Sequence, residues 1–276
     1  MEMFVCLAFF ILLFAGMIVI VALGVRLRSN PIAWDSHVMW LKRRPWTWRV
    51  ALRIGLILLC LQLAVVGFIQ TAKALGWLTG QEPGSWSMLV QGLFFHVASL
   101  LLLVVVIREY GFSWHEAFGL KKHDFINHIG QGIICYLAVL PFFFSASLIY
   151  RLVLFLFGYS ITIQNVALFF LEPQSTWALI CLLVIGVVVA PVAEEALFRG
   201  IILPLLMKRI GAGAAIFVTS LLFAIIHFHL PSIIPLFVLA LALSIAYIMT
   251  KSIVVPIVMH VFFNGMSLAL LLTIAG

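Results

Sequence analysis

The sequence predicts an all-α membrane protein, a polytopic bundle of about eight transmembrane helices with both termini on the non-cytoplasmic side. Two observations lead to this prediction. Of the 276 residues, 65% are hydrophobic and only 9% are charged, whereas a soluble domain carries about a quarter charged residues. Apolar runs of about 20 residues recur along the whole chain, and each is long enough to cross a hydrocarbon layer of about 30 Å as a helix.

The apolar runs place the spans in order along the chain. They cover residues 3–25, 50–72, 85–107, 129–150, 176–198, 212–229, 232–250 and 253–275. The first run has no preceding basic residue and no cleavage site after it, so we interpret it as a retained helix and not as a signal peptide. Residues 150–173 suit an interfacial or re-entrant segment. Because Pro231 and Pro235 interrupt the helical pattern, the sixth and seventh helices are expected to be short or kinked.

Basic residues are concentrated in alternate loops, and this pattern predicts the orientation. We place loops 26–53 and 108–124 on the cytoplasmic side, together with the C-terminal ends of the fifth and seventh spans. Only Lys73 and Arg151 then lie on the non-cytoplasmic side, which agrees with the positive-inside rule. The formal net charge of +7 therefore indicates topology and not nucleic-acid binding. The tryptophans among the cations of 42–53 are typical of interfacial anchors, and contact with anionic lipid headgroups is the alternative.

Residues 1–170 form an N-terminal helical part without a recognisable motif, and residues 171–276 form the part that carries chemistry. His96 and Gln91 in the third span are more typical of polar helix packing than of catalysis. The cysteines lie in apolar runs without C-x-x-C spacing, so we expect small buried hydrophobic residues and no disulfide or zinc ligand. They are Cys6, Cys60, Cys135 and Cys181.

Two adjacent glutamates stand in an otherwise apolar run, VVVAPVAEEALFRG at 187–200. Only Glu194 and Glu195, of the nine acidic residues, fall within a predicted span. Burying an ionised carboxylate in a bilayer costs several kcal/mol, so a functional role is the default interpretation and a structural ion pair is the alternative. Arg199 lies on the same helix face as Glu195, in the favourable order for a pair. Glu194 is rotated from Glu195 by about 100° and has no counter-ion in its own helix, which suits a general base.

Two later helices carry polar residues at helical spacing. Phe223 and His227 are four residues apart, as are His260 and Asn264, so each pair is expected on one helix face. A single intramembrane histidine is more often a packing residue than a catalyst. The combination of one unpaired glutamate, two histidines and an asparagine on consecutive helices favours a site.

A predicted reversal of the chain near Gly211 brings these groups together. Glu194 lies about 17 residues before this turn and His227 about 16 after it, so an antiparallel hairpin places both about 25 Å from the turn. His260 lies about 10 Å into its own span. The three side chains are therefore expected at one level, in the cytoplasmic half of the membrane.

These three motifs, in this order, closely resemble those of the CAAX protease and bacteriocin-processing (CPBP, or Abi) family of intramembrane glutamate proteases. The family includes the Ras-converting prenyl-protein endopeptidase. The resemblance covers about residues 175–275, and it is much less specific for substrate than for the family. It implies that Glu194 activates water with the help of His227, that His260 and Asn264 stabilise the oxyanion, and that Glu195, Arg199 and Phe223 support them.

A metal site is the alternative chemistry. Glu194, His227 and His260 could supply three zinc ligands with water in the fourth position. The sequence lacks H-E-x-x-H, Asn264 is a poor zinc ligand, and the resemblance favours a metal-free glutamate site. No cofactor is therefore predicted, with zinc as the minority alternative.

The leading hypothesis is an intramembrane endopeptidase acting on membrane-associated or lipid-modified peptides. The expected partners are a membrane peptide or protein substrate and the lipid bilayer, without nucleic acid, and the expected location is a bacterial cytoplasmic membrane. A non-catalytic membrane scaffold or regulator in peptide maturation or self-immunity is the main alternative. A transporter that uses Glu194 as a proton relay is a third, although no internal repeat supports it.

Overall fold

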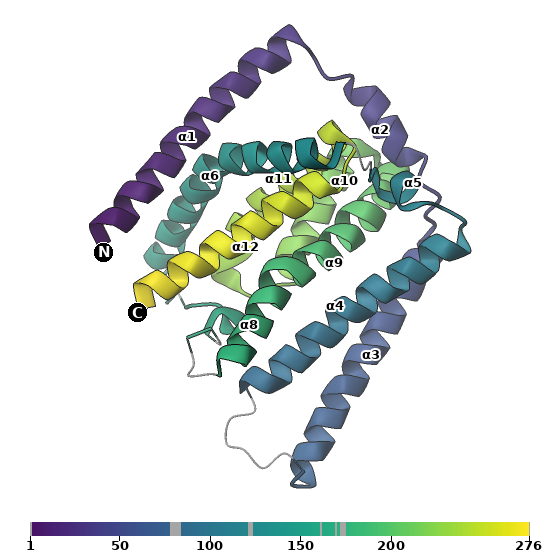
Figure 1. Ribbon diagram of the computed structural model, residues 1–276, viewed down its shortest axis with the longest axis vertical. Coiled ribbons are helices and arrows are strands. Elements are labelled where there is room, and N and C mark those ends of the chain that lie inside the picture. The colour runs from purple at the N-terminus through teal and green to yellow at the C-terminus, as the bar shows by residue number, and fades with distance from the viewer. Residues whose placement is uncertain are drawn as a thin grey trace.

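The computed structural model describes residues 2–77, 84–120, 124–160, 162–168, 170–171 and 175–275, and within these residues it contains helices and no strand (Figure 1). The helices are α1 (Glu2–Ser29), α2 (Trp34–Lys42), α3 (Trp48–Ala74), α4 (Gly84–Glu109), α5 (Trp114–Phe118), α6 (Phe125–Leu156), α7 (Asn165–Leu168), α8 (Thr176–Val184), α9 (Ala190–Leu197), α10 (Leu203–Ile225), α11 (Ile233–Thr250) and α12 (Val254–Ala275). Two π-helical segments, Ile185–Val189 and Phe198–Ile202, precede and follow α9. The prediction of a polytopic helical bundle is confirmed.

Seven helical stretches in the described residues are long and apolar enough to cross a membrane. Five of the predicted spans correspond to α1, α3, α4, α6 and α12, and a sixth corresponds to α11. The remaining two, at 176–198 and 212–229, correspond to one helical stretch, Thr176–Ile225, which ends four residues before the second of them. In the segment predicted to be interfacial, 150–173, the described residues contain the end of α6, to Leu156, and the short helix α7.

The stretch Thr176–Ile225 reverses at Gly211, whose φ of 79° and ψ of 171° lie outside the helical region. This conformation is open to glycine and strained for residues with a Cβ atom. After the turn the chain runs back along itself, so that the rings of Phe198 and Phe223 are 5.3 Å apart. The predicted antiparallel hairpin is therefore confirmed. Its return limb ends at Ile225, earlier than the predicted residue 229, which makes it short as expected.

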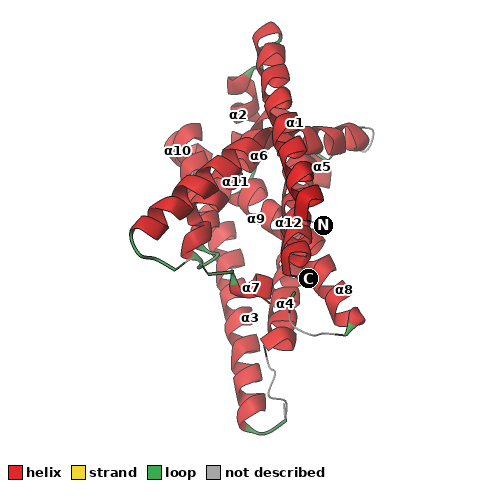
Figure 2. Cartoon of the chain, turned by 90° about the vertical axis from the view of Figure 1, so that its left-hand side faces the viewer, coloured by secondary structure: helices red, strands yellow, loops and turns green. Residues whose placement is uncertain are grey.

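The centre of the bundle consists of α6, α11 and α12, which pack against one another, and α10 packs on α11 (Figures 1 and 2). Helix α1 covers α6, while α3 and α4 form a separate pair that reaches the bundle through α9. The α6–α12 contact is close because Gly132 has no side chain. A Cβ atom at Gly132 would lie 2.6 Å from the Cβ of Val258.

The loops at one end of the bundle hold the start of the hairpin in place. Trp46, which is 1% exposed, donates from Nε1 to the carbonyl of Gly200 at 2.7 Å. Lys208 donates from Nζ to the carbonyl oxygens of Arg44 and Trp46. The Arg44 guanidinium lies 3.9 Å from the centre of the Trp40 ring. The polar contacts at this end therefore join the loop 43–47 to the first limb of the hairpin, at Gly200 and Lys208.

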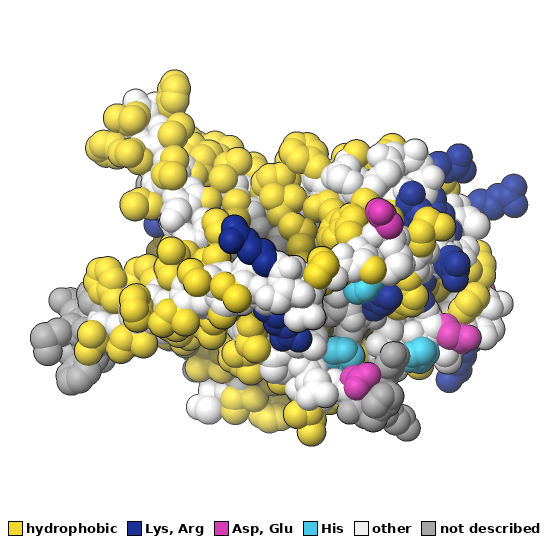
Figure 3. Space-filling view, turned by 90° about the horizontal axis from the view of Figure 1, so that it is seen from above, with side chains coloured by type: hydrophobic (Ala, Val, Ile, Leu, Met, Phe, Trp, Pro, Cys, Tyr) yellow, Lys and Arg dark blue, Asp and Glu magenta, His cyan; other side chains and the backbone are white. Residues whose placement is uncertain are grey.

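Most described basic side chains belong to this end, and Figure 3 shows them gathered on it. Lys121 and Lys122, which the predicted topology also uses, lie outside the described residues. Both termini lie near each other (Figures 1 and 2). Cys60, Cys135 and Cys181 are free, and the side chain of Cys6 is outside the described set.

Gly132→Ala is expected to destabilise the protein, because the new methyl group would collide with Val258 across the α6–α12 contact. Overpacking of this kind costs about 1–3 kcal/mol. Gly130→Ala is the matched control on the same helix, since a Cβ atom there meets nothing within 4 Å. Thermal unfolding in detergent measures both variants, and equal unfolding temperatures would contradict the close approach of α6 and α12.

Candidate active site

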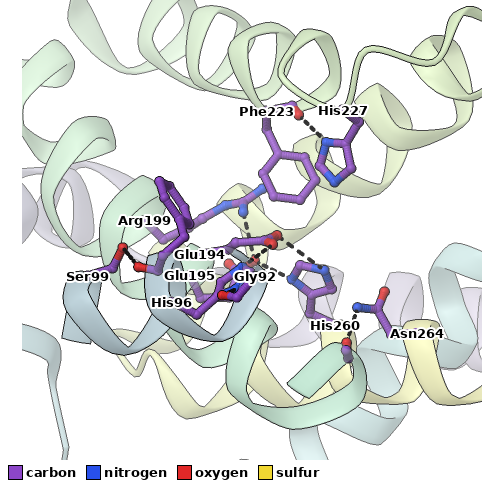
Figure 4. A network of polar contacts seen from close by, with 12 residues as sticks. Gly92, His96, Ser99, Glu194, Glu195, Arg199, Phe223, His227, His260 and Asn264 are labelled. Atoms are coloured by element: carbon purple, nitrogen blue, oxygen red, sulfur yellow. Dashed lines mark hydrogen bonds and ion pairs between the residues drawn. The ribbon is translucent and has the colours of Figure 1, made fainter. Parts of the chain in front are cut away.

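Four parts of the chain bring polar side chains to one point in the bundle (Figure 4). Helix α9 and the π-helical segment after it carry two glutamates and an arginine, and α4 carries a histidine. The turn after α10 carries a second histidine, and α12 carries a third together with an asparagine. These residues are Glu194, Glu195, Arg199, His96, His227, His260 and Asn264. All the predicted site residues therefore lie in one region, and His96 joins them.

Glu195 is the centre of a buried ionic network. Its Oε1 atom accepts from Arg199 Nη1 at 2.8 Å and from His260 Nδ1 at 2.8 Å. The Glu195 and Arg199 side chains are both 0% exposed. Arg199 also donates from Nη2 to the carbonyl of Ala240 at 3.1 Å, and its guanidinium lies 4.7 Å from the Phe223 ring centre. The predicted Glu195–Arg199 contact is present, and the network also holds His260.

Glu194 points away from this network. Its Oε1 atom lies 3.4 Å from His96 Nε2, and its Oε2 atom lies 3.8 Å from His260 Nε2. The side chain is 18% exposed, and Oε2 has no hydrogen-bond partner in the described structure. The two glutamates thus face different partners, as their rotation on the helix predicted. One carboxylate oxygen of Glu194 is therefore buried without a hydrogen bond in the described structure.

His96 was expected to make a polar helix-packing contact, and the structure shows that its contact across the helices is with Glu194. Its Nδ1 contacts the carbonyl of Gly92 within α4 at 2.6 Å, while its Nε2 faces Glu194 of α9. No local pattern in the sequence reveals this contact, because it depends on how α4 packs against α9. The available signal was a histidine within an apolar span, where ionisable residues are costly and tend to be functional.

The i, i+4 spacing predicts that His227 lies on the same helix as Phe223. In the structure, His227 lies two residues beyond the end of α10. The expected proximity to Phe223 persists nevertheless. His227 Nδ1 donates to the Phe223 carbonyl at 2.7 Å, and the two rings are 4.9 Å apart. Because a carbonyl oxygen only accepts, Nδ1 carries the proton and Nε2 of the neutral ring keeps a lone pair. The Phe223 ring is also 5.6 Å from the His260 ring, so it lies between the two histidines.

Asn264 follows His260 by one turn of α12 and donates from Nδ2 to the carbonyl of Gly186 at 2.8 Å. That carbonyl is available for a local reason. Within the π-helical segment, the N–H of Ala190 bonds to the oxygen of Ile185. The next donor in the i→i+5 pattern is Pro191, which has no N–H. Asn264 therefore satisfies an otherwise unpaired backbone acceptor and keeps its second amide N–H.

The site contains no recognised metal-binding group of three or more histidine, cysteine, aspartate or glutamate side chains within the described residues. The Glu194 carboxylate has two histidine nitrogens within 4 Å, His96 Nε2 and His260 Nε2. Any ion at this site would be bound by these atoms. His227 would not join it in the present arrangement, since its ring makes no ion-pair contact with Glu194 in this structure.

Arg199→Ala is expected to reduce protein yield and thermal stability. The substitution leaves Glu195 as a buried carboxylate without its arginine, and breaking a buried pair from one side costs about 3–5 kcal/mol. Arg209→Ala near the exposed hairpin turn is the control and should behave as wild type. Fluorescence-detected size-exclusion chromatography after heating measures both. Wild-type stability of Arg199→Ala would refute a structural role for the pair.

Comparison with known proteins finds a family to which part of this chain is similar. Residues 175–266 match the family model of the Rce1-like proteins, described as type II CAAX prenyl endopeptidase Rce1-like. The matched range begins at α8 and includes Glu194, Glu195, Arg199, His227, His260 and Asn264. The chain matches no curated protein and no solved structure. The family match confirms the resemblance seen in the three motifs, and the segment 175–266 is similar to the Rce1-like family of CAAX endopeptidases.

Proposed function

We propose that this chain is an intramembrane endopeptidase that hydrolyses peptide bonds of membrane-associated or lipid-modified substrates. The observation that supports this most is the unequal treatment of the two glutamates. Oε1 of Glu195 accepts from both Arg199 and His260 in a fully buried position. Glu194 has no arginine partner among the described residues, lies 3.4 Å and 3.8 Å from the His96 and His260 nitrogens, and is 18% exposed. A site that served stability alone would gain nothing from a second carboxylate that has no arginine partner.

Water activation begins at Glu194. A water molecule hydrogen-bonded to Oε2 loses a proton to the carboxylate, and its oxygen forms a bond to the carbonyl carbon of the substrate peptide. His227 has its Nε2 lone pair available and can orient or deprotonate the same water from the other side of the site. The π electrons of the peptide carbonyl move to its oxygen, which becomes an oxyanion.

His260 and Asn264 are suited to stabilise that oxyanion. An imidazolium His260 donates from both nitrogens, through Nδ1 to Glu195 and through Nε2 to the oxyanion. Asn264 has one amide N–H left after bonding to Gly186. Removal of one such donor costs about 3–4 kcal/mol of transition-state stabilisation in enzymes with an oxyanion hole.

Collapse of the tetrahedral intermediate completes hydrolysis. The electrons return from the oxyanion, the C–N bond breaks, and the amine nitrogen takes the proton that Glu194 had accepted. The carboxylic acid product keeps the oxygen from water, so this mechanism has no acyl-enzyme intermediate. Protein groups supply the base, the proton donor and the oxyanion donors, and for that reason we propose a mechanism independent of metal ions.

We also infer that the site lies in the cytoplasmic half of a bacterial cytoplasmic membrane, with both termini on the opposite side. The charge distribution supports this, because the basic loop 42–53 contacts Lys208, just before the hairpin turn, through the Arg44 and Trp46 carbonyls. The substrate would then reach the site from the membrane or its cytoplasmic surface.

Glu194→Gln is expected to abolish cleavage without affecting folding, because the amide has nearly the shape of the carboxylate and cannot take a proton from water. The measurement compares the termini of membrane proteins, by mass spectrometry, in cells expressing wild type or the variant at matched levels. New termini present only with wild type would identify a peptidase and its cleavage sequence. Identical termini with both proteins folded would favour a non-catalytic scaffold.

Chelation tests the metal-independent mechanism separately. Cleavage by the purified protein is expected to persist in the presence of 1,10-phenanthroline and EDTA, because no step in the proposed reaction needs an ion. Elemental analysis of the active protein provides a second measurement. Loss of activity on chelation with recovery on adding zinc would instead assign a metal to the carboxylate and histidines of the site.

A further inference from the structure

His96 belongs to α4, outside the segment that matches the Rce1-like family. Its side chain is 15% exposed and lies against Glu194, with 3.4 Å between Nε2 and Oε1. Figure 4 shows the ring reaching from α4 towards the glutamate. This is the shortest of the contacts between Glu194 and the histidines of the site, since His260 Nε2 is 3.8 Å from Oε2.

The His96 ring is held in one orientation. Nδ1 lies 2.6 Å from the Gly92 carbonyl, an atom that only accepts, so Nδ1 carries a proton. The Phe95 ring lies edge-on to the imidazole, with centroids 5.4 Å apart and an interplanar angle of 89°. Nε2 is therefore the nitrogen presented to Glu194, and the backbone contact sets its direction. A second group that fixes the tautomer of a histidine is common at catalytic sites.

The Nε2–Oε1 contact is favourable only with a proton between the two atoms. Either an imidazolium donates to the carboxylate, or the protonated Glu194 donates to a neutral imidazole. In both forms Oε1 is occupied by His96, and Oε2 is the oxygen left for water. Because Oε2 lacks a hydrogen-bond partner in the described structure, the carboxylate has one oxygen supported by His96 and one oxygen that can still accept a hydrogen bond.

We propose that His96 is a positioning residue for Glu194. The His96 ring occupies Oε1 so that Oε2 meets the water, and it shares the proton that Glu194 accepts. This proposal rests on the proposed peptidase function. It also assigns α4 a role, since this helix would supply the site with a residue that the three motifs do not contain.

Simple helix packing would not produce this arrangement. Gln91 on the same helix contacts Gln62 of α3 at 3.4 Å, and Ser99 bonds to the Phe95 carbonyl within α4. Neither makes a hydrogen bond to the motif residues. His96 alone, among these three polar side chains of α4, has one nitrogen fixed by its own helix and the other directed at Glu194.

Three variants of the full chain test the proposal, purified in detergent, with a fluorescent farnesylated CAAX-type peptide as the probe substrate. His96→Leu keeps the bulk and removes the hydrogen bond, so kcat should fall about 10- to 100-fold with KM nearly unchanged. His96→Gln can donate to or accept from Oε1 and should stay within about threefold of wild type. Gln91→Leu is the control on α4 and should keep wild-type kcat. Wild-type kcat in His96→Leu, or equal losses in the Leu and Gln variants, would overturn the proposal.

A readout independent of activity separates this proposal from the peptidase function. Solid-state NMR of protein labelled with ¹⁵N-histidine identifies the His96 ring nitrogens by their absence in His96→Gln. Their signals should shift in Glu194→Gln and remain in place in Gln91→Leu. Unchanged His96 signals in Glu194→Gln would refute the contact, whatever the protein cleaves. Failure of wild type to cleave any peptide, with the shift present, would count against the peptidase function and leave the contact supported.

Discussion

The buried carboxylate of Glu195 is the interaction on which the site depends. One oxygen accepts from Arg199 on the following π-helical segment and from His260 on α12, and Arg199 in turn reaches the backbone of α11 at Ala240. Three separate helical elements are thereby fixed relative to one another in a medium where unpaired charge is very unfavourable. This fixation leaves Glu194, the preceding residue, outside the arginine pair, with its carboxylate facing His96 and His260. Glu195 thus holds the helices together, and the neighbouring Glu194 is left as the proposed base.

Much of this arrangement could be predicted from the sequence because the relevant signals are local or periodic. Apolar runs predicted the spans, the i, i+4 spacing predicted the Glu195–Arg199 pair, and residue counts on either side of Gly211 placed Glu194 near His227. The contacts of His96 and of His260 with the glutamates could not be predicted this way. They depend on which helices become neighbours, and a bundle of apolar helices gives few sequence signals for that choice. The sequence predicted a helix as far as residue 229, because the apolar run continues through 226–229. It therefore gave no indication that α10 ends before His227.

The two π-helical segments show what further signal the sequence contained. Pro191 follows the first segment and Pro204 follows the second, each two residues after it ends. In an α-helix each proline ring would clash with the carbonyl four residues earlier, and a widened turn relieves that clash. The prolines therefore favour irregular turns on both sides of α9. π-helical turns occur frequently at functional sites, so these two prolines were a usable indication of where the site lies.

The first π-helical segment, Ile185–Val189, also explains the position of α12 along α9. Because Pro191 has no N–H, the Gly186 carbonyl needs another donor, and Asn264 supplies it from α12. His260, one turn earlier on α12, then meets Glu195 at 2.8 Å. The backbone defect and the buried carboxylate thus fix α12 at two points one helical turn apart. If His260 and Asn264 form the oxyanion site, the contacts His260–Glu195 and Asn264–Gly186 set their distances from Glu194. Neither of these contacts involves Glu194 itself. The base can then change its protonation state during a reaction while the donors that face the oxyanion keep their positions.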